Sequence, residues 1–211
     1  MNRTFLLGLM LMPGGALAAQ APRLAFFGGG GAVRVHETIG RRTQVFNTAL
    51  PTGEAVLSLG PVVIEGHYGQ GHLDPQSGSV VGRDLVEGSV YAGLRFAQRF
   101  MLSGGTRARS YVQPAGTRRH LAVIARGTFE TPVASSIASA RIDVWTALLG
   151  RTNIDERFDN ARGGEAALTL HFPNSPLWAR LGYRVEHTLF DGGGREETVE
   201  GLRFMVGLGT S

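Results

Sequence analysis

Hydrophobic and polar residues alternate along most of the chain with a period of two. In one segment, Leu177, Leu181 and Val185 share one face of a strand, while Arg180 and Arg184 share the other. Seven consecutive segments repeat this arrangement. Strict alternation is typical of antiparallel strands that have one apolar and one polar face. No convincing amphipathic helix follows the N-terminal region, so the pattern predicts an all-β protein.

The alternating segments give about ten strands, at residues 31–38, 52–59, 62–72, 84–96, 100–112, 119–130, 137–149, 164–172, 177–189 and 197–209. The first two segments show the weakest pattern. If residues 20–60 formed a plug or a loose lead instead, the count would be eight. Segments of this length can cross a bilayer as tilted strands.

The links between segments alternate in length. The short links are at residues 59–61, 97–99, 131–136 and 173–176. The longer polar links are at residues 40–51, 73–83, 113–118, 150–163 and 190–196. Tight periplasmic turns and longer outer loops are typical of outer-membrane barrels. We therefore expect an antiparallel up-and-down transmembrane β-barrel over residues 31–211.

The N-terminus has the three parts of a secretory signal. Arg3 supplies a positive charge, residues 5–12 are apolar, and residues 16–19 are small. This pattern predicts a signal peptide over residues 1–19 and export from the cytoplasm. We expect residues 20–30 to form a lead into the barrel, with the run of four glycines as a flexible entry.

Composition excludes several classes of function. The 211 residues contain 31 Gly and no Cys, so a thiolate metal site, an iron–sulfur cluster and a cysteine nucleophile are all excluded. Every basic residue other than His is Arg, which raises the isoelectric point although the net charge is only +4. The arginines do not form a cluster, so we expect no nucleic-acid partner.

The polar face of the predicted strands carries charges of both signs. Facing inward, these side chains would pair across a narrow lumen, because buried charges need partners. The predicted lumen charge network comprises Glu65, Glu87, Arg95, Arg107, Arg109, Arg126, Glu130, Arg141, Asp143, Glu165, Arg180, Arg184, Glu186 and Arg203. The same alternation would also fit a soluble periplasmic barrel with its apolar face inside. The many small residues on the apolar face favour the membrane barrel, because they would leave a closed interior unfilled.

Large aromatic residues gather beside the short links. They are Phe96, Phe100, Phe129 and Phe172. Aromatic girdles mark the membrane interfaces of outer-membrane barrels. We therefore expect these four residues to form a girdle on the periplasmic side.

The architecture resembles the small bacterial outer-membrane β-barrel proteins. The stretches 60–71 and 83–88 are similar to uncharacterised barrels of this kind. The resemblance implies a porin-like protein in the outer membrane of a Gram-negative cell. Its expected partners are membrane lipids and the barrel assembly machinery. Such barrels usually end in an aromatic residue, whereas the last aromatic here is Phe204.

Candidate chemistry is sparse, and we expect no metal and no cofactor. His67 and His72 are five residues apart on a strand and point to opposite faces, so they cannot share a metal. We expect His120 and His171 to join the lumen network. The acids of residues 150–163 fit no calcium-loop spacing. His187 lies beside Thr188, which directs the two side chains apart and prevents a lipid-hydrolase triad.

The sequence thus predicts a monomeric, integral outer-membrane β-barrel with a charge-paired lumen and a structural or surface-interaction role. Three alternatives remain open at this point. They are a narrow channel that favours anions, a barrel enzyme that hydrolyses lipid or peptide at the outer rim, and a soluble periplasmic barrel. Whether the barrel is an enzyme stays open, with a non-enzymatic role favoured.

Overall fold

The computed structural model describes residues 21–76, 80–134 and 137–209. The predicted signal peptide at residues 1–19 lies outside this described part. The strands are β1 (Arg23–Ile39), β2 (Arg42–Leu59), β3 (Val62–Pro75), β4 (Arg83–Phe96), β5 (Phe100–Gln113), β6 (Gly116–Ala134), β7 (Ala138–Thr152), β8 (Phe158–His171), β9 (Leu177–Phe190) and β10 (Arg195–Gly209). One short 3-10 turn, η1 (Asp191–Gly193), joins β9 to β10.

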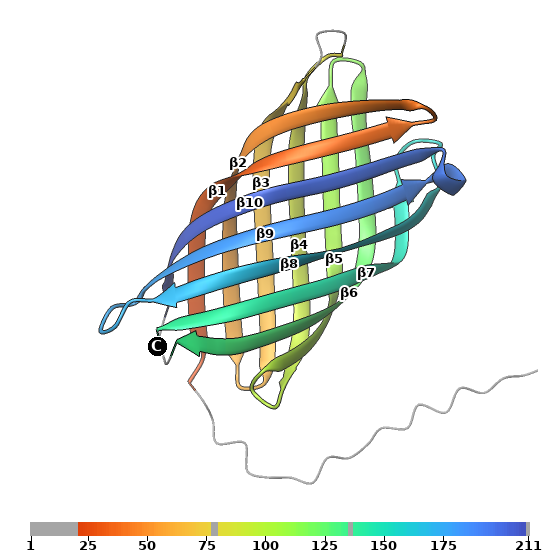
Figure 1. The fold of residues 1–211 in the computed structure, drawn as a ribbon. Helices are drawn as coiled ribbons and strands as arrows, with labels where there is room; N and C mark the ends of the chain where they lie inside the picture. The colour runs from red at the N-terminus through yellow and green to blue at the C-terminus, as the bar shows by residue number, and fades with distance from the viewer. Residues whose placement is uncertain (1–20, 77–79, 135–136, 210–211) are drawn as a thin grey trace, which may run out of the picture.

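The strands form one closed, antiparallel up-and-down barrel (Figure 1). Each strand pairs with its neighbours in sequence, and β1 pairs with β10 to close the sheet. The predicted fold class is confirmed with ten strands, and the eight-strand alternative is wrong. Among the described residues, no helix has the length and apolar character needed to cross a membrane.

An even number of strands places both ends of the barrel domain on one side. We call this side the terminal end, and it also holds the turns after β2, β4, β6 and β8 (Figure 1). The opposite side, the far end, holds the turns after β1, β3, β5, β7 and β9.

The expected lead at residues 20–30 is wrong in part, because β1 already begins at Arg23. The glycine run is strand rather than a flexible entry. A Cβ atom on Gly29 or Gly31 would collide with the carbonyl oxygens of Phe204 and Leu202 on β10. These glycines therefore let β1 approach β10 closely enough to close the barrel.

The predicted long link at residues 40–51 is also wrong. A two-residue turn follows β1, and Gly40 takes the left-handed conformation there with φ of 59°. The expected link at residues 113–118 is also only a two-residue turn, because β5 ends at Gln113 and β6 begins at Gly116. These polar residues belong to strand ends whose outer face is polar, and composition alone made them look like loops.

Candidate functional site

The interior of the barrel holds ion-paired side chains over much of its height. All members of the predicted network except Arg95 and Glu130 form ion pairs there. Their strands alternate strictly, so every second side chain points inward. The charges meet across the lumen, where burial makes an unpaired charge costly.

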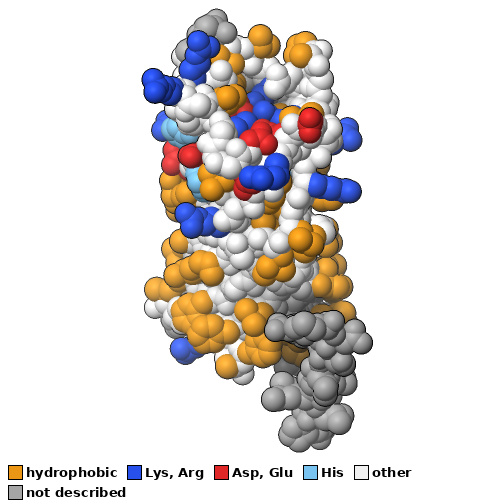
Figure 2. Space-filling view, turned by 90° about the vertical axis from the view of Figure 1, so that its right-hand side faces the viewer, with side chains coloured by type: hydrophobic (Ala, Val, Ile, Leu, Met, Phe, Trp, Pro, Cys, Tyr) orange, Lys and Arg blue, Asp and Glu red, His pale blue; other side chains and the backbone are white. Residues whose placement is uncertain are grey.

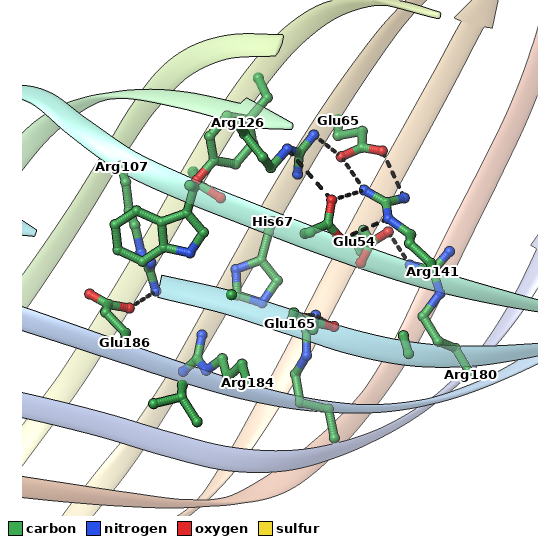
Figure 3. A pocket seen from close by; sticks show the side chains of 18 of the residues that line it. Glu54, Glu65, His67, Arg107, Arg126, Arg141, Glu165, Arg180, Arg184 and Glu186 are labelled. Atoms are coloured by element: carbon green, nitrogen blue, oxygen red, sulfur yellow. Dashed lines mark hydrogen bonds and ion pairs between the residues drawn. The ribbon is translucent and has the colours of Figure 1, made fainter. Parts of the chain in front are cut away.

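A first cluster lies on β3, β6 and β7. Arg141 Nη1 lies 3.0 Å from Glu65 Oε1, and Arg141 Nε lies 2.8 Å from Asp143 Oδ2. Arg126 also contacts Glu65, and its guanidinium stacks 4.2 Å above the ring centroid of Tyr91. Figure 3 shows Glu65, Arg126 and Arg141 pointing toward one another.

A second cluster has Arg109 at its centre. Its guanidinium donates to Glu186 and Glu197 at 2.9 Å and to Glu87 at 3.2 Å. Arg109 is 4 % exposed, Glu87 2 % and Glu197 0 %. One arginine therefore holds three carboxylates that have almost no access to solvent.

Two further ion pairs stand beside these clusters. Arg180 Nη1 lies 2.6 Å from Glu54 Oε1, and Arg203 contacts Glu165. Glu54 was absent from the predicted network, although it lies on the inner face of β2.

A third cluster at the far end was also missed. Glu37 accepts hydrogen bonds from Arg83 at 2.9 Å and from Arg118 and Arg195 at 2.7 Å. Arg195 also lies 2.8 Å from Glu156. Arg83, Arg118 and Arg195 sit at strand ends that were assigned to links, whereas Glu37 lies in the predicted strand at 31–38 but was left out of the network. Continuing the alternation past the expected ends would have found Arg83, which is in phase with the inward Glu87.

Arg95 and Glu130 do not join the network. Both line an open vestibule of about 800 Å³ at the terminal end, which Arg23 and Trp178 also line. Arg95 is exposed, and no ion pair involves it within the described residues. Glu130 accepts a hydrogen bond from Ser139 at 3.0 Å. Both side chains therefore face the vestibule rather than the ion-paired interior.

The charged side chains leave little free space at mid-height. The central cavity has a volume of about 90 Å³, and His67, Arg107, Arg184 and Glu186 are among the side chains around it (Figure 3). His67 and the buried His120 do lie inside the barrel, whereas His72 is on the outer wall.

The outer wall changes character along its height. On the part nearer the terminal end, the outward side chains are apolar or small, as Leu202 and Phe204 of β10 show. Toward the far end, outward positions become polar or charged. The first such positions on four neighbouring strands, which we call the boundary, are Arg34 on β1, Arg162 on β8, His187 on β9 and Glu200 on β10. Figure 2 shows hydrophobic side chains gathered on the lower part of the wall and charged ones above.

The interior of the far half is mixed, because an apolar cluster lies there beside the buried ion pairs of Glu37 and Glu197. The largest buried apolar cluster lies inside the far half, on β1 to β5 and β10. It comprises Val33, Val35, Phe46, Leu50, Leu73, Leu85, Tyr111 and Val199. On β1 the inward Val33 and Val35 therefore flank the outward, exposed Arg34.

Of the four aromatic residues predicted as a girdle, Phe96, Phe100 and Phe172 border turns at the terminal end, and Phe129 lies within β6 opposite Phe100. Phe96, Phe100 and Phe172 are exposed on the outer wall. The rings of Phe100 and Phe129 contact each other, with centroids 4.9 Å apart.

The candidate hydrolase pair is split by the wall. His187 points outward and lies 3.6 Å from Glu196, whereas Thr188 is inside and 3 % exposed. These two side chains cannot act as base and nucleophile on one substrate. Within the described ranges, no three His, Asp or Glu side chains are placed to hold a metal ion.

Solved structures with the same architecture come from bacterial outer membranes. The outer membrane protease OmpT from Escherichia coli aligns with a TM-score of 0.55 and 9% identity over 90% of this chain and 96% of that one. The translocator domain of the autotransporter NalP from Neisseria meningitidis aligns with a TM-score of 0.51 and 12% identity over 91% and 90%. No protein-family model and no curated protein matches the sequence.

The chain has the fold of a bacterial outer-membrane β-barrel. At such low identity the comparison concerns the fold alone. What the barrel does must be inferred from its own walls and interior.

Proposed function

We propose that the protein is an integral outer-membrane barrel with a closed, charge-paired lumen and a structural or surface-interaction role. The observation that carries the proposal is the change of the outer wall at the boundary, from apolar side chains to polar or charged ones (Figure 2). Nearer the terminal end the wall is apolar outside and ion-paired inside. Above the boundary the outer wall is polar or charged, as in a protein surrounded by water, and the interior holds both an apolar cluster and the buried ion pairs of Glu37.

The height of the apolar wall supports this placement. On β9 the outward positions from Leu177 to Val185 are apolar or aromatic, and the next one is His187. With a rise of about 3.3 Å per residue and a tilt of about 40°, these positions span about 20 Å, and barrels carry an apolar band roughly 25 Å tall. The terminal end would then face the periplasm and the far end the outside.

The aromatic residues fit the same placement. Phe96, Phe100, Phe129 and Phe172 would mark the periplasmic interface, because aromatic rings favour the head-group level. Membrane lipids are the primary partners under this proposal. The barrel assembly machinery would insert the chain, and we propose a monomer.

The narrow interior favours a closed barrel over an anion channel. The central cavity of about 90 Å³ lies between ion-paired clusters that would have to separate before an ion could pass. Breaking buried pairs leaves uncompensated charges and is costly. We therefore propose that the lumen does not conduct.

Cell fractionation followed by gel electrophoresis tests the placement. The protein should appear in the outer-membrane fraction and should migrate faster without boiling, because a folded barrel stays compact in detergent. A soluble periplasmic band with no mobility difference would overturn the proposal in favour of the soluble barrel.

Planar-bilayer recording tests the closed lumen separately. The wild-type barrel should give no conductance steps. As a positive control, the triple variant Glu65→Ala, Arg126→Ala, Arg141→Ala should widen the constriction and produce steps. Conductance steps in the wild type would contradict the closed lumen and support the channel instead.

A further inference from the structure

We propose that the outer wall over β5 to β9 binds one phosphorylated, acylated lipid of the outer leaflet, a site that deepens the proposed membrane function and rests on it. A shallow groove of about 1050 Å³ runs across this wall. Its lower part is apolar and hollow, and its upper part ends in polar side chains at the boundary.

The groove follows two adjacent rows of paired residues. The lower row runs Leu102, Gly127, Val144, Gly164 and Val185 from β5 to β9. Large and small residues alternate along it, and Leu102 and Val144 are more than 60% exposed, at 64% and 61%. The glycines leave depressions between exposed aliphatic side chains, a shape into which an acyl chain can pack.

The upper row runs from small to polar residues. It comprises Gly104, Ala125, Thr146, Arg162 and His187. Its last three members lie side by side on β7, β8 and β9 and offer a hydroxyl, a guanidinium and an imidazole. Guanidinium groups bind phosphate through charge-assisted, bidentate hydrogen bonds.

Arg162 differs from the other boundary arginine in having no partner. Arg34 lies 3.7 Å from Glu200 and donates to Asn47 at 3.2 Å. Arg162 is exposed, and no ion pair or hydrogen bond of its side chain occurs within the described residues. An unpaired cation at the top of an apolar groove is complementary to a lipid with an anionic head group. Because Arg162 is on the side of the far end, the lipid belongs to the outer leaflet.

Two substitutions test the two halves of the site. Gly127→Leu fills a depression, and the structure accommodates it because a Cβ there meets Val144 and Leu102 at 3.8 and 3.9 Å. Arg162→Gln removes the charge. Matched controls are Gly66→Leu, an outward glycine on β3 with open space around it, and Arg34→Gln.

The measurement is retention of bis-phosphorylated lipid A by the full barrel in a neutral detergent, followed by native mass spectrometry. The wild type and both controls should retain one lipid. Arg162→Gln should weaken retention roughly tenfold, the expected loss of one charge-assisted contact, and Gly127→Leu should abolish it. Heat-dependent gel migration verifies that each variant is folded.

Several results would overturn the inference. Equal retention by all variants would show unspecific coating without a groove site, and equal loss in all four would show that retention does not depend on the groove. Loss in Arg162→Gln alone would reduce the site to a surface charge without a bound chain. If the wild type fractionates to the outer membrane but retains no lipid A, only this inference fails. If it does not reach the outer membrane, the proposed function fails as well.

Discussion

The terminal half and the far half of the barrel wall use the same alternation but differ in the polarity of their outer faces. On β9 in the terminal half, Arg180 and Arg184 point inward, while Leu181 and Tyr183 point outward. On β1 in the far half, the inward Val35 is fully buried, and the outward neighbour is charged. A period of two therefore says only that the two faces differ. The surroundings of each stretch decide which face is apolar, and these change at the boundary.

The largest effect should come from reversing the polarity of the terminal half. The double variant Arg180→Leu, Leu181→Arg places a charge on the apolar wall and leaves Glu54 without its arginine. A charge at mid-height of a barrel wall costs about 2–4 kcal/mol, and an orphaned buried carboxylate costs about 3–5 kcal/mol. We expect no fast-migrating, folded band on an unboiled gel. A folded double variant would contradict the membrane placement of this wall.

Removing the central arginine of the interior should come next. Arg109→Met leaves Glu87, Glu186 and Glu197 with one partner fewer each. We expect a loss of about 3–5 kcal/mol in the free energy of unfolding, because an uncompensated buried charge remains. Urea denaturation in detergent measures it. Arg95→Met is the matched control, and an equal loss there would mean that the pairing is not what stabilises the interior.

A truncation in the far half tests whether its interior is a packed apolar core. Leu50 is 1% exposed inside the apolar cluster, whereas Leu181 is 48% exposed on the outer wall of the terminal half. Leu50→Ala should cost about 2–5 kcal/mol, as in other protein cores. Leu181→Ala should cost far less, because lipid or detergent fills the space. If the two losses in urea denaturation were equal, the halves would not differ in this way.

The sequence alone predicts the barrel but not the boundary. Alternation identified inward residues such as Arg109 correctly, since only the phase of the strand is needed. Arg83 was missed because, above the boundary, the outward neighbours are polar too, and the segment looks like a loop. The outer groove could not be predicted from the sequence. Gly127 and Arg162 come to line the same groove only through the register of β6, β7 and β8.

The smallest effect should come from an ion pair on the outer wall of the far half. His72 Nδ1 lies 2.7 Å from Asp84 Oδ1, but both side chains are more than half exposed, at 57% and 55%. Water screens such pairs, and ordering the two side chains offsets much of the attraction. Asp84→Asn should therefore leave the urea midpoint unchanged within error. A loss comparable to that of Arg109→Met would mean that water does not reach this part of the wall, and it would move the boundary toward the far end.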